Sequence, residues 1–332
     1  MFPFLNNKSI LITGGTGSFG KKAVHFLLKN TNIKKIIILS RDEQKHHRFN
    51  IELNKNQRSK VRFFIGDIRD YGRVQMASKD VDYIIHAAAM KHVYLSEYNP
   101  NEAISSNIIG TQNLIRASIE NNCKKMILLS TDKAVEPINL YGATKLCAEK
   151  IVIASNSYSS RQTTRFAVVR YGNVIASEGS VIQKFLLDKK NNKKYFNVTS
   201  REMTRFWINF DKAVNFVFSS LNASKGGEIF IPKMVNFKIT DIARSIDIKK
   251  KVKFTGSIIG EKDYEKLITE YESLRCIILK DRYIIYPDKE FIFWDQKNKD
   301  YQKKFNKKKF SYQSNHNLIT NINKIKKILG LN

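Results

Sequence analysis

The 332-residue chain contains few cysteines, and none of them is spaced like a metal ligand. Cys123, Cys147 and Cys276 are odd in number and lie far apart. This excludes a fold held together by disulfides and a zinc site built on paired cysteines. The pattern is typical of structural thiols in a reducing compartment.

Acidic residues are also scarce: 30 Asp and Glu stand against 58 Lys and Arg, which gives a formal net charge of +28. Such a surface favours anionic ligands, nucleic acid or an acidic membrane. With 5 Pro, 15 Gly and an abundance of Lys, Asn, Ile, Phe and Tyr, the composition is also what an AT-rich coding sequence produces. Because charge alone is a weak indicator of nucleic-acid binding, we expect no specific nucleic-acid partner.

No stretch of the chain approaches the roughly 18 consecutive apolar residues that a membrane helix needs. Residues 1–7 lack the basic and apolar regions of a signal peptide. We therefore expect a cytoplasmic protein without a membrane partner. A hydrophobic fraction of 42% excludes a mainly disordered chain, and this length suffices for one large domain or two close ones.

Short apolar runs alternate with amphipathic stretches in the first half of the chain, and two further runs follow. Little polar alternation within the runs is typical of strands buried on both faces of a parallel sheet. This alternation predicts an α/β fold with a doubly wound parallel sheet, whose ligand lies at the carboxyl ends of the strands. The predicted strands are residues 9–13, 33–39, 61–65, 81–86, 125–130, 165–170 and 228–232, and the predicted helices are residues 21–30, 41–53, 101–121, 141–155 and 319–329.

The pattern becomes irregular in the second half, which predicts a smaller, interleaved C-terminal substrate domain. We assign residues 1–172 to an NADP-binding Rossmann domain, to which the chain returns around residues 205–232. Residues 173–204 and 233–295 then form the substrate-binding part. Residues 296–332 are expected to be a basic, solvated C-terminal tail.

A glycine motif follows the first predicted strand directly and opens the first predicted helix. Its glycines have separate tasks: a tight turn, close approach of the backbone to a pyrophosphate, and close packing of helix on strand. The anion then binds at the helix N-terminus. The strand before the motif and the helix after it are the context that a dinucleotide site requires. The expected cofactor contacts here are Gly14, Gly17, Ser18, Phe19 and Gly20.

The end of the second predicted strand indicates which dinucleotide binds. An acidic residue at this place usually binds the ribose 2′-hydroxyl of NAD, whereas an Arg accommodates the 2′-phosphate of NADP. Arg41, beside Asp42 and with Lys45 one turn later, favours NADP. At the next two strand ends, an Asp can meet the adenine amino group and a small residue lets the cofactor pass, so we add Asp67, Ile68 and Ala87.

A second cluster of polar residues follows the fifth predicted strand. Thr131, Asp132 and Lys133 come first, and Tyr141 and Lys145 lie four residues apart, hence on one face of the next helix. A Tyr is a poor base at its ordinary pKa of about 10. A fixed ammonium one turn away and a positive nicotinamide ring favour its phenolate.

These motifs resemble those of the extended short-chain dehydrogenases/reductases, and among them the inverting UDP-N-acetylglucosamine 4,6-dehydratases of the pseudaminic acid pathway. The resemblance covers about residues 8 to 240. A related subgroup of dehydratase/epimerases lacks the Tyr that this chain has at position 141. The matching segments are GGTGSFGK (14–21), SRDEQK (40–45), GDIRD (66–70), HAAAMK (86–91), EYNP (97–100), STDKAVEPINLYGATK (130–145), RYGNV (170–174), MTRFWI (203–208) and GGEIFIPK (226–233).

The resemblance implies a role for each residue of this cluster. Tyr141 takes the C4 hydroxyl proton, Lys133 takes the C5 proton, and Asp132 protonates the departing C6 hydroxyl. The product is a 4-keto-6-deoxy sugar nucleotide for surface or flagellin glycans, and the enzyme is expected to be a homo-oligomer. The residues that match substrate contacts of the family are Lys91, Thr131, Asn173 and Arg205.

The chain departs from the family where phosphate-binding cations are usual. Ile258 and Glu178 stand at usual Arg positions, and Tyr94 at a usual Pro. Substrate identity is therefore less firmly indicated than reaction type. A UDP-hexose 4-epimerase, a C5-retaining dehydratase and a non-catalytic NADP-binding protein remain alternatives. An epimerase does not need the Asp-Lys pair, which favours the dehydratase. No metal site is expected, because the histidines are few and isolated, and His46 and His47 are expected on an exposed helix.

Overall fold

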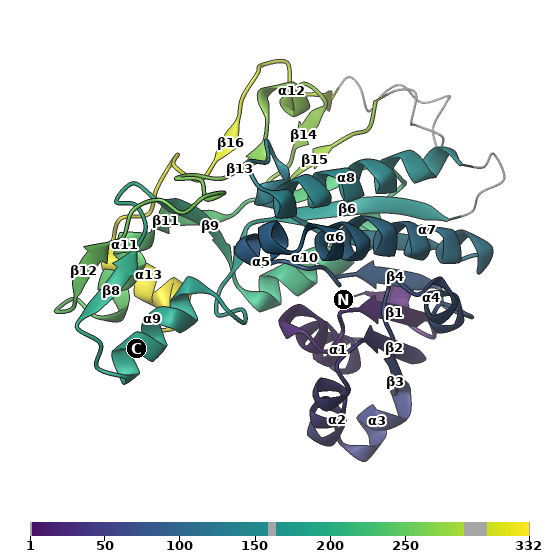
Figure 1. Cartoon of the computed structure of the whole chain (residues 1–332). Coiled ribbons are helices and arrows are strands. Elements are labelled where there is room, and N and C mark those ends of the chain that lie inside the picture. The colour runs from purple at the N-terminus through teal and green to yellow at the C-terminus, as the bar shows by residue number, and fades with distance from the viewer. Residues whose placement is uncertain (1, 159–163, 289–303, 332) are drawn as a thin grey trace.

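The computed structural model describes residues 2–158, 164–288 and 304–331. Among these residues the central sheet has nine strands and carries helices on both faces (Figure 1). The strands from β10 to β3 run parallel, and β15 and β14 continue the sheet beyond β10 in antiparallel pairing. In their order across the sheet the strands are β14 (Cys276–Ile278), β15 (Arg282–Ile285), β10 (Ile229–Pro232), β6 (Arg165–Tyr171), β5 (Lys125–Thr131), β4 (Tyr83–His86), β1 (Ser9–Thr13), β2 (Lys35–Ser40) and β3 (Val61–Ile65).

The predicted helices that flank the sheet are present, with others between them. The first begins at Ser18 rather than at residue 21, since the glycine turn leads directly into it. The segment predicted as one helix at 101–121 is divided by a π-helical turn, η2 (Ser105–Ile109). The helices around the sheet are α1 (Ser18–Asn30), α2 (Glu43–Glu52), α3 (Lys55–Lys60), α4 (Tyr71–Ala77), α5 (Val93–Tyr98), α6 (Pro100–Ile104), α7 (Gly110–Glu120), α8 (Leu140–Ala154) and α10 (Phe210–Ala223).

Side chains alternate between the two faces of the sheet along each buried strand. In β1, Ile10 and Ile12 belong to a core shared with α1 and α10, whereas Leu11 belongs to a core shared with α7 and α8. All five residues of β1 are buried. The predicted α/β fold with a doubly wound parallel sheet is confirmed. No helix of the described residues is both long and apolar enough to cross a membrane.

A smaller part with its own apolar core lies beyond the sheet (Figure 1). The expected boundaries differ from the structure at two places. Residues 205–208 pair in a small sheet of this part, and β14 and β15, within the range 233–295, join the large sheet as a hairpin at its edge. The elements of the smaller part are β7 (Asn173–Val174), α9 (Val181–Lys190), β8 (Tyr195–Val198), β9 (Thr204–Ile208), β11 (Val235–Lys238), α11 (Ile239–Ile246), β12 (Lys251–Phe254) and α13 (Ile322–Leu329).

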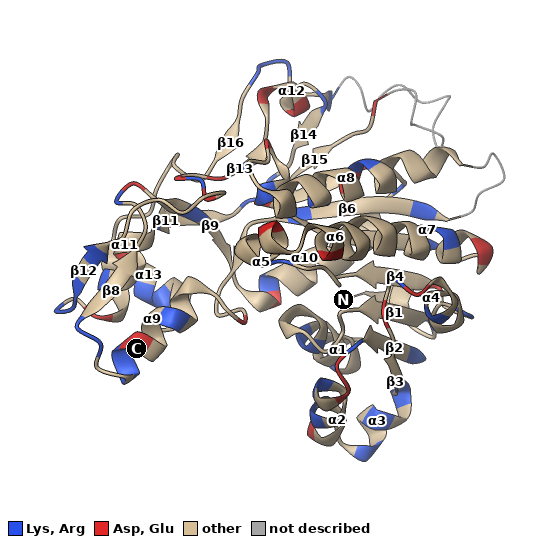
Figure 2. Cartoon of the chain, viewed as in Figure 1, with Lys and Arg blue, Asp and Glu red and all other residues tan. Residues whose placement is uncertain are grey.

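The expected solvated tail is instead packed into the fold from residue 304 onward. β16 (Tyr312–Gln313) pairs with β13 (Lys266–Ile268), and Ser314 is fully buried. Ile325 of α13 is buried in the core of the smaller part, whereas Lys324 and Lys327 are exposed. Figure 2 marks the basic residues of this helix in blue. The helix expected at the end of the tail is present, and its isoleucines anchor the tail in the apolar core although residues such as Lys307, Lys308 and Lys309 stay exposed. Residues 296–303 lie outside the described residues.

A buried ion cluster connects the segment at residues 267–272 to the large sheet. The Arg170 guanidinium, in β6, donates to both carboxylate oxygens of Glu149 in α8, at 3.1 and 2.6 Å. It also donates to Glu272 of α12 (Glu270–Ser273), at 3.2 and 3.0 Å, and to the Leu267 carbonyl at 2.9 Å. All donor groups of this guanidinium are therefore engaged, and the two carboxylates raise its pKa although burial opposes this.

We expect Arg170→Met to lower the free energy of unfolding by about 3–5 kcal/mol, because it leaves the buried Glu149 carboxylate without its cation. Urea unfolding monitored by circular dichroism measures this loss. Glu202→Gln is the matched control, since Glu202 forms only an exposed pair with Lys238 and exposed pairs contribute about 0–1 kcal/mol. Equal unfolding midpoints for the two variants would contradict a stabilising role of the cluster.

Candidate active site

The glycine motif forms a turn that leaves room for an anion at the start of α1. Gly14 has a positive φ of 65°, and a Cβ there would lie 3.0 Å from the Ala88 backbone. A Cβ on Gly20 would lie 2.4 Å from Gly15, so strand and helix approach closely only without a side chain. Gly17 precedes α1 without a side-chain cap, and Ser18 and Phe19 form its first turn. The backbone N–H groups at this end therefore suit a pyrophosphate.

The residues after β2 separate into a helix cap and two cations. The Asp42 carboxylate accepts from the Lys45 backbone N–H at 3.0 Å and so caps α2. The Lys45 ammonium lies 3.5 Å from the Glu178 carboxylate. The Arg41 guanidinium is exposed and lies 3.7 Å from the Asp67 carboxylate. Of the two cations, Arg41 is the one with the looser partner and hence the better candidate for a 2′-phosphate.

The remaining predicted cofactor residues lie along the same edge of the sheet. Asp67 accepts from the backbone and side chain of Arg69, whose contacts lower the pKa of Asp67 although partial burial opposes this. Ile68 is buried against Gly110, where a Cβ would lie 2.6 Å away. Ala87 follows β4 and lies against Gly14. The structure thus brings the predicted cofactor residues to the carboxyl ends of neighbouring parallel strands, where such folds bind ligands.

A loop from the smaller part, residues 175–180, reaches the cofactor edge. The Glu178 backbone N–H donates to the Ser18 hydroxyl at 3.3 Å, and the Lys91 ammonium donates to the Glu178 carbonyl at 2.7 Å. The Glu178 carboxylate, which stands at a usual Arg position, is therefore beside the N-terminus of α1. A negative charge at this place opposes the binding of a second anion.

We expect Glu178→Gln to strengthen binding of the nicotinamide dinucleotide two- to fivefold, the size of an exposed charge–charge interaction of about 0.5–1 kcal/mol. The substitution also frees the ammonium of Lys45. Titration calorimetry at low and high salt measures the effect, which should shrink as salt screens the charge. Glu202→Gln, remote from the cofactor edge, serves as the control. Unchanged affinity at low salt would show that the carboxylate does not act on the bound anion.

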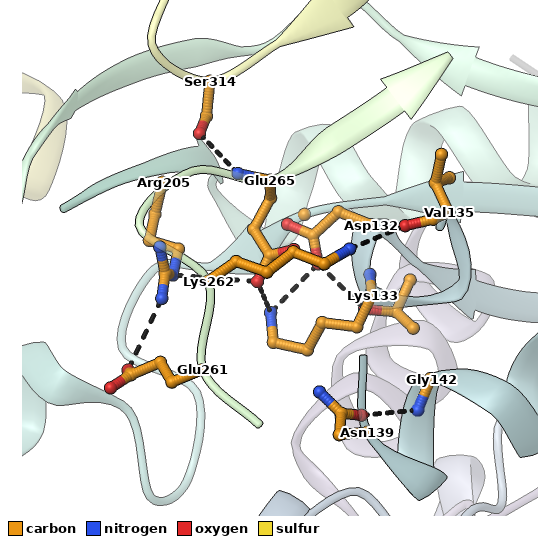
Figure 3. Close-up of polar contacts among 12 residues, drawn as sticks. Asp132, Lys133, Val135, Asn139, Gly142, Arg205, Glu261, Lys262, Glu265 and Ser314 are labelled. Atoms are coloured by element: carbon orange, nitrogen blue, oxygen red, sulfur yellow. Dashed lines mark hydrogen bonds and ion pairs between the residues drawn. The ribbon is translucent and has the colours of Figure 1, made fainter. Parts of the chain in front are cut away.

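A buried ion network lies at the carboxyl end of β5, in the short helix η3 (Asp132–Ala134). The Lys133 ammonium lies 3.0 Å from the Asp132 carboxylate and 3.2 Å from the Glu265 carboxylate (Figure 3). The Asp132 side chain is 0% exposed and that of Glu265 is 3% exposed, whereas that of Lys133 is 21% exposed. Lys133 is therefore the member of this network that a ligand can touch.

The two carboxylates beside Lys133 determine its protonation state. Burial lowers the pKa of the ammonium, but Asp132 and Glu265 together outweigh burial and raise it above its ordinary value. The expected role as a base needs the neutral amine, so the network favours the opposite form. Asp132 accepts from the Thr131 hydroxyl at 3.0 Å as well as from Lys133. Lys133 is thus an ammonium ion at neutral pH.

Tyr141 lies at the start of α8, which Asn139 caps by accepting from the Gly142 N–H at 2.7 Å. The Tyr141 side chain is hydrogen-bonded to Thr131. Burial raises the pKa of Tyr141 to about 12, although the nearby Lys133 ammonium and the hydrogen bond to Thr131 lower it. The lowering of the Tyr141 pKa that was expected from Lys145 therefore comes from Lys133.

Lys145 itself donates to the Leu129 carbonyl at 2.8 Å, within the core of the domain. Burial lowers the pKa of its ammonium to about 8, although the Glu149 carboxylate opposes this. A cation that is weakly held can lose its proton near neutral pH. Lys145 is thus placed to hold the helix against the end of β5 and to respond to charge at the ligand.

The predicted substrate residues fall into two groups. Arg205, on β9, lies beside the ion network: it donates to the Thr204 carbonyl at 2.8 Å, and its guanidinium lies 3.4 Å from Glu261. Asn173, on β7, pairs with Trp207 next to it. Lys91 instead lies with Glu178 near the cofactor edge.

The residues at the departures from the family pattern do not form part of the ion network. Ile258 and Tyr94 are exposed, at 57% and 72%. At position 258 the usual Arg is therefore replaced by a side chain that offers no charge to a diphosphate.

Sequence reasoning missed three members of the network, all from one segment after β12. Glu265 pairs with Lys133, Glu261 pairs with Arg205, and the Lys262 ammonium donates to the Val135 carbonyl at 2.8 Å. No local pattern marks these residues, because their partners lie more than fifty residues away in the chain. The only available signal was the position of Glu261 and Lys262 directly after the departure at Ile258.

Histidines play a structural part. The His86 ring lies between the hydroxyls of Thr13 and Thr111, at 2.8 and 3.0 Å, and burial lowers its pKa to about 3. His46 was expected on an exposed helix but is buried, because its Nε2 is bonded to the Ser40 carbonyl at 3.0 Å. Among the described residues, no group of three or more His, Cys, Asp or Glu is arranged to hold a metal ion.

The sheet order, the glycine turn and the Tyr141–Lys145 helix define a dinucleotide-binding enzyme with the fold of the extended short-chain dehydrogenases/reductases. The chain belongs to the family described as polysaccharide biosynthesis protein, whose model matches residues 10–287. It is 46% identical, over 94% of each chain, to a UDP-N-acetylglucosamine 4,6-dehydratase (inverting) of Campylobacter jejuni. It is 42% identical to a UDP-glucose 4-epimerase of Rickettsia bellii, over 85% of this chain and 84% of that one. The X-ray structure of Pen from Bacillus thuringiensis is similar over 99% of both chains, with 35% identity and a TM-score of 0.88.

Proposed function

We propose that this protein is an NADP-dependent, C5-inverting UDP-N-acetylglucosamine 4,6-dehydratase. The observation that carries the proposal is the Asp132–Lys133 pair beside Tyr141 at the carboxyl end of β5. The 46% identity to the inverting dehydratase over 94% of the chain supports it. β-Elimination needs an acid and a base next to adjacent carbons, and the pair supplies both from one turn.

When bound, the nicotinamide dinucleotide supplies the acceptor and later the donor of one hydride. Tyr141 takes the C4 hydroxyl proton; burial raises the pKa of this phenol, and the Lys133 ammonium and the hydrogen bond to Thr131 offset part of that rise. The 3.0 Å contact between the Lys133 ammonium and the Asp132 carboxylate lets one proton pass from nitrogen to oxygen. Once it is neutral, the Lys133 amine takes the C5 proton, and this contact passes the proton to Asp132, which gives it to the C6 hydroxyl, so that the hydroxyl leaves as water.

The direct contact of Asp132 with substrate requires a movement, because its side chain is fully buried beneath Lys133. One consistent route is that the Lys133 side chain swings toward C5 as it takes the proton and so uncovers Asp132. Inversion follows when C5 receives a proton on the face opposite to the one it left. The atoms balance: the sugar loses one water and keeps its hydride.

We expect Lys133→Ala to lower the dehydration rate by about 10²–10⁴, the usual contribution of a positioned acid–base group, while NADP binding is retained. Incubation of the wild-type protein with UDP-N-acetylglucosamine in heavy water, followed by NMR, should show deuterium at C5 with inverted configuration. Retained configuration would favour the C5-retaining dehydratase. A product epimerised at C4 without loss of water would favour the epimerase, and no product at all with tight NADP binding would favour the non-catalytic protein.

The cofactor preference is tested separately. Because Arg41 is exposed beside the end of β2, its guanidinium can form a charge-assisted contact with a 2′-phosphate. Arg41→Ala should reduce the ratio of the NAD to the NADP dissociation constant about tenfold, as expected for a contact of this kind. Arg48→Ala, on the helix α2 that follows Arg41, is the control for lost surface charge. An unchanged ratio would remove Arg41 from the cofactor site.

We further infer the setting of the reaction from composition and family. The product is a 4-keto-6-deoxy sugar nucleotide that serves pseudaminic acid and surface or flagellin glycans, and the enzyme acts in the cytoplasm as a homo-oligomer. The net charge of +28 reflects composition rather than a nucleic-acid partner.

A further inference from the structure

Glu265 is buried in the ion network although its segment lies outside the doubly wound sheet. Its backbone N–H donates to the Ser314 hydroxyl at 2.9 Å, and Ser314 also bonds to Thr204. β13, which begins at Lys266, pairs with β16, which ends just before Ser314. The carboxylate is therefore fixed from the C-terminal side of the chain, and Figure 3 shows it directed toward Lys133.

The carboxylate is placed to act on Lys133 rather than to stabilise the fold in a general way. One oxygen lies 3.2 Å from the Lys133 ammonium and 4.0 Å from the Arg205 guanidinium. The other oxygen, Oε2, is buried and has no hydrogen-bond partner in the described structure, as is also true of Oδ2 of Asp132. Buried carboxylate oxygens are normally paired. Oε2 of Glu261 is a third such oxygen in the same network, so three carboxylates there each keep one oxygen without a hydrogen-bond partner among the described residues.

We propose that Glu265 is a positioning residue for proton transfer: it holds the Lys133 ammonium between two carboxylates, and it stabilises the proton that Lys133 receives from C5. This inference rests on the proposed dehydratase function. A base whose protonated form is stabilised binds its proton more strongly, so Glu265 makes the neutral amine a stronger base. The same contact makes the neutral amine rarer at neutral pH. Glu265 therefore sets both the strength of the base and the pH at which it becomes available.

The first test measures the protonation of Lys133 without requiring catalysis. Trace acylation of the cofactor-bound protein across pH, read at each lysine by peptide mass spectrometry, reports the fraction of neutral amine. At pH 9 we expect Lys133 to react about tenfold faster in Glu265→Gln than in the wild type, since one charge-assisted contact is lost. Glu270→Gln is the matched control, an identical change at an exposed residue five positions further on. Equal rates at Lys133 in wild type and Glu265→Gln would overturn the proposal.

Lys145 reports whether each variant is folded, because it is buried and bonded to the Leu129 carbonyl. It should stay unreactive in every folded variant. If Glu265→Gln exposes Lys145 and so fails to fold, Glu265→Asp replaces it. Shortening the side chain by one methylene lengthens the contact, so Lys133 should react faster than in the wild type while Lys145 stays protected. Unchanged reactivity of Lys133 in that variant would overturn the proposal.

The second test is the pH dependence of turnover. In Glu265→Gln the rising limb of kcat should move to lower pH, and its plateau should fall because the amine is a weaker base. KM should change little, since a residue buried beneath Lys133 does not touch the substrate. A plateau that falls without movement of the limb would show a merely structural role. If the wild type itself yields no dehydrated product, the proposed function fails, and the acylation test still decides whether Glu265 acts on Lys133.

Discussion

Two cations of the doubly wound part each take a second carboxylate from the segment at residues 265–272. Lys133 pairs with Glu265, and Arg170 pairs with Glu272. Each cation also has a carboxylate of its own part, Asp132 or Glu149, so the later segment completes a network that is only half formed without it. An uncompensated charge in the interior is costly. Detachment of residues 265–272 from the doubly wound part would therefore remove one carboxylate from each cation. The active site and the junction between the parts are therefore held by the same short stretch.

The two clusters differ in how completely their polar atoms are paired. Arg170 has every donor engaged, whereas the network around Lys133 contains three buried oxygens without a hydrogen-bond partner among the described residues, on Asp132, Glu261 and Glu265. A fully paired cluster resists movement, and a partly paired one can gain or lose protons at lower cost. The first fixes the distance between β6 and the C-terminal segment. The second, a few residues away, has the freedom in charge that an elimination reaction needs.

The sequence predicted the parts of the molecule whose signals are local. The strands of the sheet, the glycine turn at Gly14 and the polar turn at Asp132 follow from short apolar runs and the residues that end them. What it did not predict depends on contacts distant in sequence: the packing of α13, the hairpin of β14 and β15, and Glu265 beside Lys133. The protonation of Lys133 belongs to the same class. Its pKa is raised by a carboxylate 132 positions further on, which no reading of the STDK motif could reveal.

The two departures from the family pattern bear on substrate affinity and leave the reacting groups untouched. Glu178 contacts Ser18, Lys45 and Lys91 at the cofactor edge, and Ile258 is exposed, whereas Asp132, Lys133 and Tyr141 form their own contacts at the end of β5. In the proposed reaction, chemistry at C4, C5 and C6 would depend on the second group, and recognition of a diphosphate on the first. A chain can therefore keep the elimination reaction while it loses cations that bind phosphate. The two groups of residues are separate in space. The reaction type is therefore more firmly indicated than the identity of the nucleotide sugar.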